Sequence, residues 1–213
     1  MIPYYQDDAV TIYHGDALEV LSGIDTQEVS LTLTDPPYNV GLDYSDGDER
    51  PDYAEWSRAW AQAVPRPLVF TPGMVNLAMW YGIEDPTWVC SWTKSNQCSP
   101  SALGGFNTWE PILVYGRPTK RVGQDAWVVP ISTNQEGVGN HPCPKFLPMW
   151  RRLVQAFSEP DDTILDLFVG SGTTLRASKD LGRKAIGIEI EERYCEIAAK
   201  RCAQEVLDLG GAM

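Results

Sequence analysis

Residues 31–38 read Leu-Thr-Leu-Thr-Asp-Pro-Pro-Tyr, an apolar and polar alternation that ends in an acid, two prolines and an aromatic residue. The alternation of apolar and polar residues over 29–33 predicts a β-strand. The two prolines cannot continue a sheet ladder, and their rings fix φ. The Asp35 carboxylate, the neighbouring carbonyls and the Tyr38 ring are therefore held at the carboxyl end of a strand, where open α/β sheets bind ligands. The simpler alternative is a strand followed by a proline turn with an incidental tyrosine.

A second stretch, residues 164–174, reads Ile-Leu-Asp-Leu-Phe-Val-Gly-Ser-Gly-Thr-Thr. This pattern predicts a buried strand, a glycine turn that allows close backbone approach to a ligand, and then a helix. Residues 184–190 are the next expected strand, and their acid, Glu189, follows Gly170 by 19 positions. At about that spacing, the acid of the second strand meets a ribose hydroxyl in nucleotide-binding βαβ units. The order of these elements predicts a nucleotide-type cofactor.

Together the two motifs resemble those of amino-methyltransferases that act on DNA and depend on S-adenosylmethionine. The resemblance is to the permuted class, in which Asp-Pro-Pro-Tyr precedes Phe-x-Gly-x-Gly. Two further stretches resemble elements of this family, His-Gly-Asp at 14–16 and His-Pro-Cys-Pro-Lys at 141–145. The similarity covers residues 11–40, 107–117 and 141–202, which is most of the chain.

The resemblance implies a Rossmann-like, doubly wound α/β methyltransferase sheet, circularly permuted, in a single domain over residues 1–213. Alternating strand and helix patterns independently predict an α/β sheet. The expected catalytic half covers 11–115 and the cofactor half 141–207, with the strands of the two motifs side by side. Irregular segments at 93–108 and 117–140 are the expected DNA contacts.

For the catalytic end, the resemblance implies chemistry on the exocyclic amine of a base, whose lone pair is delocalised into the ring. The Asp35 carboxylate and the Pro36 carbonyl would accept its hydrogens and localise that pair. The rigid Pro36–Pro37 pair would hold both acceptors in place before the substrate arrives. Tyr38 is expected to stack on a base flipped out of the duplex.

The same resemblance implies a set of cofactor contacts. Asp16 is expected near the adenine, and capping of the helix expected over 17–22 is its alternative role. Glu189 is expected on the ribose. Cys143 and Pro144 depart from the polar residues usual in the family's His-Pro element, which puts one cofactor hydrogen bond in doubt. The expected cofactor-binding residues are Asp16, Lys145, Asp166, Phe168, Gly170, Gly172, Thr173, Thr174 and Glu189.

The composition is that of a globular protein, with 43% hydrophobic residues. We expect a cytoplasmic protein with no membrane partner, because no apolar run reaches membrane-spanning length and no secretion signal is evident. The odd number of cysteines, five, argues against a disulfide framework. Two histidines without a ligand cluster predict no metal site.

A net charge of −12 is unusual for a protein that binds DNA, but the charge is unevenly distributed. Residues 1–93 carry three basic and fifteen acidic side chains, and residues 153–213 carry seven and eleven. Residues 94–152 carry seven basic and three acidic side chains, a net charge of +4. This middle segment is where phosphate contacts are expected.

We therefore expect a site-specific enzyme that transfers a methyl group from S-adenosylmethionine to adenine N6 in double-stranded DNA. Cytosine N4, an RNA substrate and an inactive DNA-binding relic remain alternatives. A nicotinamide oxidoreductase is disfavoured, because Leu175 stands where its fingerprint needs a third glycine. A homodimer and a restriction partner, as in restriction-modification systems, are left open.

Overall fold

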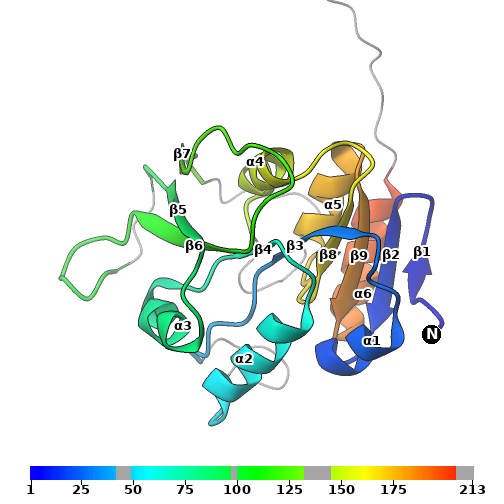
Figure 1. Cartoon of the computed structure of the whole chain (residues 1–213), viewed down its shortest axis with the longest axis horizontal. Helices are drawn as coiled ribbons and strands as arrows, with labels where there is room; N and C mark the ends of the chain where they lie inside the picture. Colours follow the sequence, from blue (N-terminus) through cyan, green and yellow to red (C-terminus); the bar gives the residue numbers. More distant parts are fainter. Residues whose placement is uncertain (42–48, 97–99, 132–144, 205–213) are drawn as a thin grey trace, which may run out of the picture.

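A computed structural model of the chain describes residues 1–41, 49–96, 100–131 and 145–204. In these ranges nine strands form one sheet in the order β1-β2-β9-β8-β3-β4-β6-β5-β7 (Figure 1). None of the helices described is long and apolar enough to cross a membrane. The strands are β1 (Tyr5–Gln6), β2 (Val10–His14), β3 (Val29–Thr34), β4 (Leu68–Phe70), β5 (Trp88–Thr93), β6 (Trp109–Tyr115), β7 (Ala126–Val128), β8 (Thr163–Asp166) and β9 (Lys184–Glu189).

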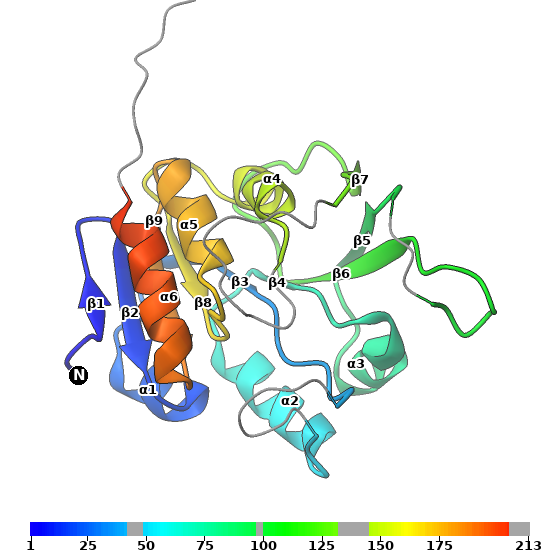
Figure 2. The same cartoon turned by 180° about the vertical axis from the view of Figure 1, so that it is seen from behind.

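Helices cover both faces of the sheet (Figures 1 and 2). α4, α5 and α6 pack on one face, and α1, α2 and α3 pack on the other. The helices are α1 (Ala17–Gly23), α2 (Tyr53–Ala63), α3 (Leu77–Ile83), α4 (Leu147–Phe157), α5 (Thr173–Asp180) and α6 (Glu192–Ala203), with a 3₁₀ turn η1 (Met74–Asn76) before α3.

The centre of the sheet is parallel, with β2, β9, β8, β3 and β4 as consecutive neighbours. β3 pairs with β8, Thr32 opposite Leu165, so the two motif strands lie side by side as expected. β6 is antiparallel to both β4 and β5. The strands of the glycine motif come last in the chain but lie in the middle of the sheet, which confirms the permuted, doubly wound fold.

Apolar side chains on both faces of the inner strands explain why these strands are nearly continuous apolar runs. In β4, Val69 joins the core under α4, whereas Leu68 and Phe70 join the core under α1 to α3. In the core under α1 to α3, the ring centroids of Trp60 and Trp80 are 5.3 Å apart, and neither side chain is more than 1% exposed. Trp60 of α2 and Trp80 of α3 thus belong to the core that packs behind the motif strands.

Two short strands and one helix start differ from the sequence expectations. The sequence predicts a loose end over residues 1–7, but β1 pairs with β2, and the Tyr4 amide donates to the Ile12 carbonyl at 2.8 Å. β7 lies inside the segment expected to be irregular, with Trp127 only 4% exposed. Both strands are too short to show an alternating pattern. The expected helix start at Pro144 lies outside the described residues, and α4 begins at Leu147.

Candidate active site and cofactor pocket

A cavity of about 470 Å³ opens at the carboxyl ends of β2, β3, β8 and β9. This is the edge at which an open α/β sheet binds ligands. Asp35 and Pro37 line it on the catalytic side. Most of the expected cofactor set also lines it, namely Asp16, Lys145, Asp166, Phe168, Gly170, Thr173, Thr174 and Glu189.

Gly172 is the expected cofactor residue that is not among those lining the cavity. Its φ is 83°, and a Cβ built on it would lie 2.8 Å from Cβ and 2.9 Å from Cα of Ala198 on α6. Glycine is therefore required here by helix packing and by the left-handed backbone. Gly187 has a similar role that the sequence did not indicate, since a Cβ there would lie 2.5 Å from Cγ2 of Val169.

The acids at the cofactor end accept hydrogen bonds mainly from the backbone. Glu189 accepts from the amides of Gly170 at 2.7 Å and Glu191 at 2.9 Å. Asp166 accepts from the Phe168 amide at 3.0 Å and from the hydroxyl of Thr34, on the neighbouring strand, at 2.6 Å. Burial raises the pKa of Glu189 to about 7 and that of Asp166 to about 6.

Asp16 combines the two roles weighed for it. Its Oδ1 accepts from the amides of Leu18 at 2.9 Å and Glu19 at 3.1 Å, so it caps α1. It also lines the cavity beside Gly15. Both cap hydrogen bonds use one oxygen, and the cap therefore does not prevent the carboxylate from also facing a ligand.

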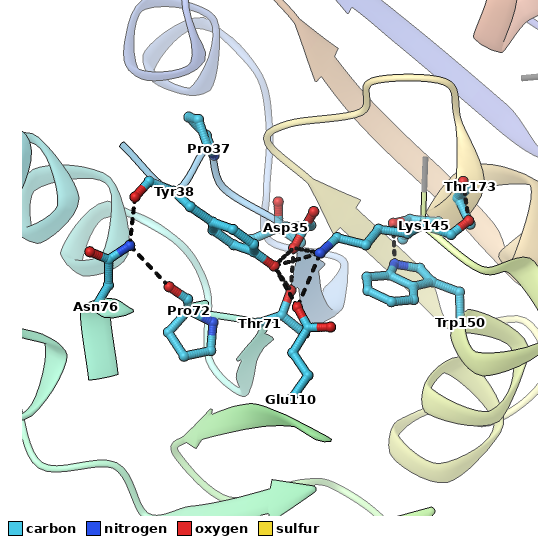
Figure 3. Close-up of polar contacts among 12 residues, drawn as sticks. Asp35, Pro37, Tyr38, Thr71, Pro72, Asn76, Glu110, Lys145, Trp150 and Thr173 are labelled. Atoms are coloured by element: carbon cyan, nitrogen blue, oxygen red, sulfur yellow. Dashed lines mark hydrogen bonds and ion pairs between the residues drawn. The ribbon is translucent and has the colours of Figure 1, made fainter. Parts of the chain in front are cut away.

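In the Asp-Pro-Pro-Tyr motif, the described hydrogen bonds distinguish the carbonyl oxygens. The Tyr53 hydroxyl donates to the carbonyl of Pro37 at 2.7 Å. The Asn76 side chain donates to the carbonyl of Tyr38 at 2.7 Å (Figure 3). No described residue donates to the carbonyl of Pro36. Two carbonyls thus fix the loop, and with respect to the described residues the Pro36 carbonyl, expected to meet the substrate amine, retains its acceptor capacity.

The Tyr38 hydroxyl lies at the centre of a charged network (Figure 3). It is 2.7 Å from Oδ1 of Asp35, 2.8 Å from Oε1 of Glu110 and 2.5 Å from Nζ of Lys145. The Lys145 ammonium is also 2.9 Å from Oδ1 of Asp35, and the Thr71 hydroxyl donates to that same oxygen. The described hydrogen bonds and ion pair of Asp35 all use Oδ1, so Oδ2 is the oxygen available to accept from a substrate.

The environment sets the charge of each network member. Burial and the charge of Glu110 raise the pKa of Asp35, and Lys145 opposes that rise. Burial alone would raise the pKa of Glu110, but Lys145 and Lys94 outweigh it and lower the pKa to about 2. Burial and both carboxylates raise the pKa of Tyr38 well above its ordinary value. The phenol therefore remains protonated, and Glu110 remains ionised.

Two network members add to the sequence expectations. Lys145, expected among the cofactor-binding residues, lines the cavity, and its ammonium pairs with Asp35 at 2.9 Å and with Glu110 at 3.2 Å. Glu110 was not expected in the site at all, because in the sequence it is the second residue of an apolar strand. Its burial, 7% exposed, could not be inferred without knowing that β6 lies beside β4.

Most cations of the basic middle segment have structural partners. Lys94 pairs with Oε2 of Glu110 at 2.5 Å. Lys120 donates to main-chain carbonyls at the C-terminal end of α4, 3.1 Å and 3.3 Å away. Arg151 pairs with Asp180 on α5. The net charge of this segment therefore overstates the number of cations that can meet a phosphate.

Strand register places the end of β6 far from the catalytic motif. Tyr115 pairs with Leu68, the first residue of β4, whereas Asp35 follows the carboxyl end of the neighbouring strand β3. Arg117 therefore lies at the edge of the sheet opposite the cavity. This geometry does not favour phosphate contacts by residues 117–121 when DNA occupies the active site.

Comparisons with known proteins agree with this geometry. A family model described as DNA methylase matches residues 87–200, more than half of the chain. The chain is 27% identical to the type II methyltransferase M.ScaI of Streptomyces caespitosus, over 97% of this chain and 86% of that protein. The solved complex of M1.HpyAVI with S-adenosylmethionine (SAM) has a TM-score of 0.68 and 25% identity, covering 92% of this chain and 100% of that one. The cytosine-N4-specific PvuII DNA methyltransferase shares the fold, with a TM-score of 0.71 at 19% identity, over 95% of this chain and 89% of that one.

Proposed function

The chain belongs to the DNA methylase family, and from that premise we propose that it methylates the N6 amine of an adenine flipped out of double-stranded DNA. It is a DNA methyltransferase that uses SAM as methyl donor. The observation that carries the proposal is the pair of acceptors at the catalytic motif, Oδ2 of Asp35 and the Pro36 carbonyl. Both belong to one rigid turn at the carboxyl end of β3, beside the strand of the glycine motif.

The two acceptors address the main chemical difficulty of the reaction. The lone pair of an exocyclic amine is delocalised into the base, so the nitrogen is a poor nucleophile. Hydrogen bonds from the amine to Asp35 and Pro36 would pull the nitrogen toward a tetrahedral arrangement and localise that pair. Because Tyr53 and Asn76 already hold the loop, little reorganisation is needed when the base arrives.

The cavity fits a nucleoside-type cofactor. Glu189 offers buried acceptor oxygens for ribose hydroxyls, held by the Gly170 and Glu191 amides. Asp16, Phe168, Thr173 and Thr174 line the same cavity, as does Asp166 at the end of β8, the strand beside β3. SAM supplies an activated methyl group, so the chain's own contribution is alignment of the amine for direct attack. No covalent intermediate on the protein is required.

The base must leave the duplex to reach this pocket, at an unstacking cost of about a few kcal/mol. We propose that Tyr38 stacks on the flipped base. One face of its ring is already packed against the backbone, because a Cβ on Gly73 would lie 3.0 Å from Cγ of Tyr38. This support keeps the ring in a fixed orientation while its hydroxyl stays in the network.

We propose that the duplex approaches the end of the sheet at which the cavity opens. The connection between β5 and β6 lies at this same end. Residues 86–109 contain no acidic side chain, although the whole chain has a net charge of −12. In the connection between β5 and β6, Leu103 is 96% exposed and Phe106 is 65% exposed. A loop without acidic side chains does not repel the phosphates of DNA, and its exposed apolar side chains can contact the bases.

Nucleoside analysis tests the target. DNA incubated with the protein and methyl-labelled SAM should yield labelled N6-methyladenine after digestion to nucleosides. Labelled N4-methylcytosine would overturn the adenine assignment, and transfer to RNA alone would overturn DNA as substrate. A 2-aminopurine at the target position should brighten on binding if the base is extruded. If it stays dark under conditions that support methylation, base flipping should be abandoned.

A further inference from the structure

Glu110 is a buried acid beside the catalytic carboxylate, and the two-acceptor mechanism does not use it. Its Oε1 is 2.8 Å from the Tyr38 hydroxyl and 3.2 Å from Nζ of Lys145. Its Oε2 pairs with Lys94 at 2.5 Å. Asp35 lines the cavity, whereas Glu110 is not among its lining residues and meets Asp35 through Tyr38 and Lys145.

The position of Glu110 follows from the sheet order. β4 ends beside the catalytic strand and leads to Thr71, and β6 is the next strand across. Glu110 lies near the beginning of β6, opposite Trp92 of β5. Because β6 is antiparallel to β4, its beginning lies at the same edge as the carboxyl end of β4. An acid at this position therefore faces the catalytic loop from the far side of Thr71 (Figure 3).

Charge balance gives Glu110 a specific task. Two ammonium groups, Lys94 and Lys145, and two carboxylates, Asp35 and Glu110, meet within this buried cluster. Within the described residues, Lys145 forms ion pairs with Asp35 and Glu110, so loss of the Glu110 charge would strengthen its attraction to Asp35. A lysine ammonium carries three donors on a flexible stem, so it could then take both oxygens of Asp35. The substrate amine would have to compete for the acceptor it needs.

We infer that Glu110 is a positioning residue of the methyl transfer, which holds the Tyr38 hydroxyl and the Lys145 ammonium on the Oδ1 side of Asp35 and so keeps Oδ2 for the target amine. This inference rests on the proposed function. Glu110 acts through Tyr38 and Lys145 and touches neither the base nor the cofactor. Its removal should therefore slow the transfer step and leave cofactor binding intact.

A change in the pH profile separates this role from general support of the fold. Among the described residues, the titratable groups facing Asp35 are Glu110 from β6, Lys145 before α4, Tyr38 on the same loop and Asp166 from β8, and Lys94 acts through Glu110. Asp35 must be ionised to accept from the amine, so the rate falls on the acid side. The Glu110 charge raises the pKa of Asp35. Glu110→Gln should therefore move the acid limb of the profile to lower pH.

The experiment compares wild type with Glu110→Gln in single-turnover methylation at saturating SAM and DNA, across pH. The rate constant should fall about 10- to 100-fold, as expected for loss of one hydrogen bond to a charged group. SAM affinity by calorimetry should be unchanged. Asp180→Asn is the matched control, because Asp180 is a carboxylate with 8% side-chain exposure, paired with two arginines at the far end of α5. It should alter melting temperature without moving the pH profile.

A second variant keeps the test decisive if Glu110→Gln does not fold. Lys94→Gln removes a positive charge that contacts Glu110, so it should move the acid limb to higher pH. Wild-type rates and an unshifted profile in the variants that fold would overturn the inference. A rate loss that only follows the melting temperature, as in Asp180→Asn, would overturn it as well. Failure of the proposed function is a different result, because the wild-type protein itself would then leave DNA unmethylated.

Discussion

The two ends of the cavity hold their acids in different ways. At the cofactor end, the described donors to Glu189 are the backbone amides of Gly170 and Glu191, and those to Asp166 are one backbone amide and the hydroxyls of Thr34 and Thr174. At the catalytic end, Asp35 is held by side chains from separate segments of the chain. The acids at the cofactor end are therefore held by neutral donors, mostly from the βαβ unit itself, whereas the catalytic end depends on a charged network that forms only when the sheet is assembled.

This difference predicts that substitutions at the two ends have separable effects. Changes at the catalytic end should alter the transfer step, and changes at the cofactor end should alter cofactor affinity. The effects should also spread differently, because a change in one network member alters the charge of its neighbours. The acids held by the backbone should respond more independently.

The largest expected effect is that of Asp35→Ala. The transfer rate should fall by about 100- to 1000-fold, which is the typical cost of removing one preorganised hydrogen-bonding group from a reacting centre. Cofactor affinity should stay within a few-fold of wild type, because Asp35 is assigned to the amine. Calorimetry and single-turnover kinetics on the same preparation check both statements. Lost cofactor affinity with retained turnover would reverse the assignment.

Glu189→Ala should weaken cofactor binding by about 1.5–3 kcal/mol, the worth of a hydrogen bond to a charged group. The loss should appear in the Michaelis constant for SAM and leave kcat nearly unchanged, since the ribose is remote from the transferred methyl group. A kcat loss that saturating SAM does not restore would place Glu189 in the transfer step.

Tyr38→Phe should raise the activation free energy of methyl transfer by about 0.5–1.5 kcal/mol, because the hydroxyl shares hydrogen bonds with Asp35, Glu110 and Lys145. Tyr38→Ala should also lose about 1–3 kcal/mol of binding free energy for the flipped base, because the ring that stacks on it is removed. Melting temperatures measured on the same proteins separate these losses from unfolding. A Phe variant as active as wild type would mean that only the ring matters.

The pH dependence of stability at the cofactor end can be tested with Glu189→Gln. Burial raises the pKa of Glu189 from 4.5 to about 7, so ionising it costs stability. That cost is absent below the unfolded pKa and grows as pH rises from 4.5 through about 7. The melting temperature of wild type should therefore fall relative to Glu189→Gln by a few degrees over this window. A constant difference between the two proteins would show that Glu189 does not titrate there.

The smallest expected effect concerns the basic segment. From charge alone, neutralising Arg117, Lys120 and Arg121 would reduce the salt slope of DNA binding by up to about 3. Because Lys120 binds α4 and Arg117 lies at the opposite edge of the sheet, Arg117→Gln with Arg121→Gln should leave the slope nearly unchanged. Phe106→Ala should weaken DNA binding under the same conditions. The opposite pattern would move the DNA surface to residues 117–121.

The sequence predicted the parts of the site that are local in the chain. The strand, glycine turn and helix at 163–180 and the acid of β9 lie within one βαβ unit, so their spacing is visible without a structure. The turn at 35–38 is equally local. The strand neighbours and the permuted order were inferred from family resemblance, and the sheet confirms them.

What the sequence missed depends on contacts between distant segments. Glu110 and Lys145 meet Asp35 only because β6, β4 and the start of α4 converge at one edge of the sheet. Gly172 was assigned to the cofactor by its motif, but its backbone is needed against α6. Charge counting likewise could not distinguish a cation that binds a helix end from one that faces solvent.

The separability of the two ends is tested most directly by one titration. Single-turnover methylation rates of wild type, Asp35→Asn and Glu189→Gln are measured against SAM concentration at saturating DNA. We expect saturating SAM to restore the Glu189→Gln rate to near the wild-type value and to leave the Asp35→Asn rate at least about 100-fold lower. Recovery of Asp35→Asn at high SAM, or failure of Glu189→Gln to recover, would contradict this expectation.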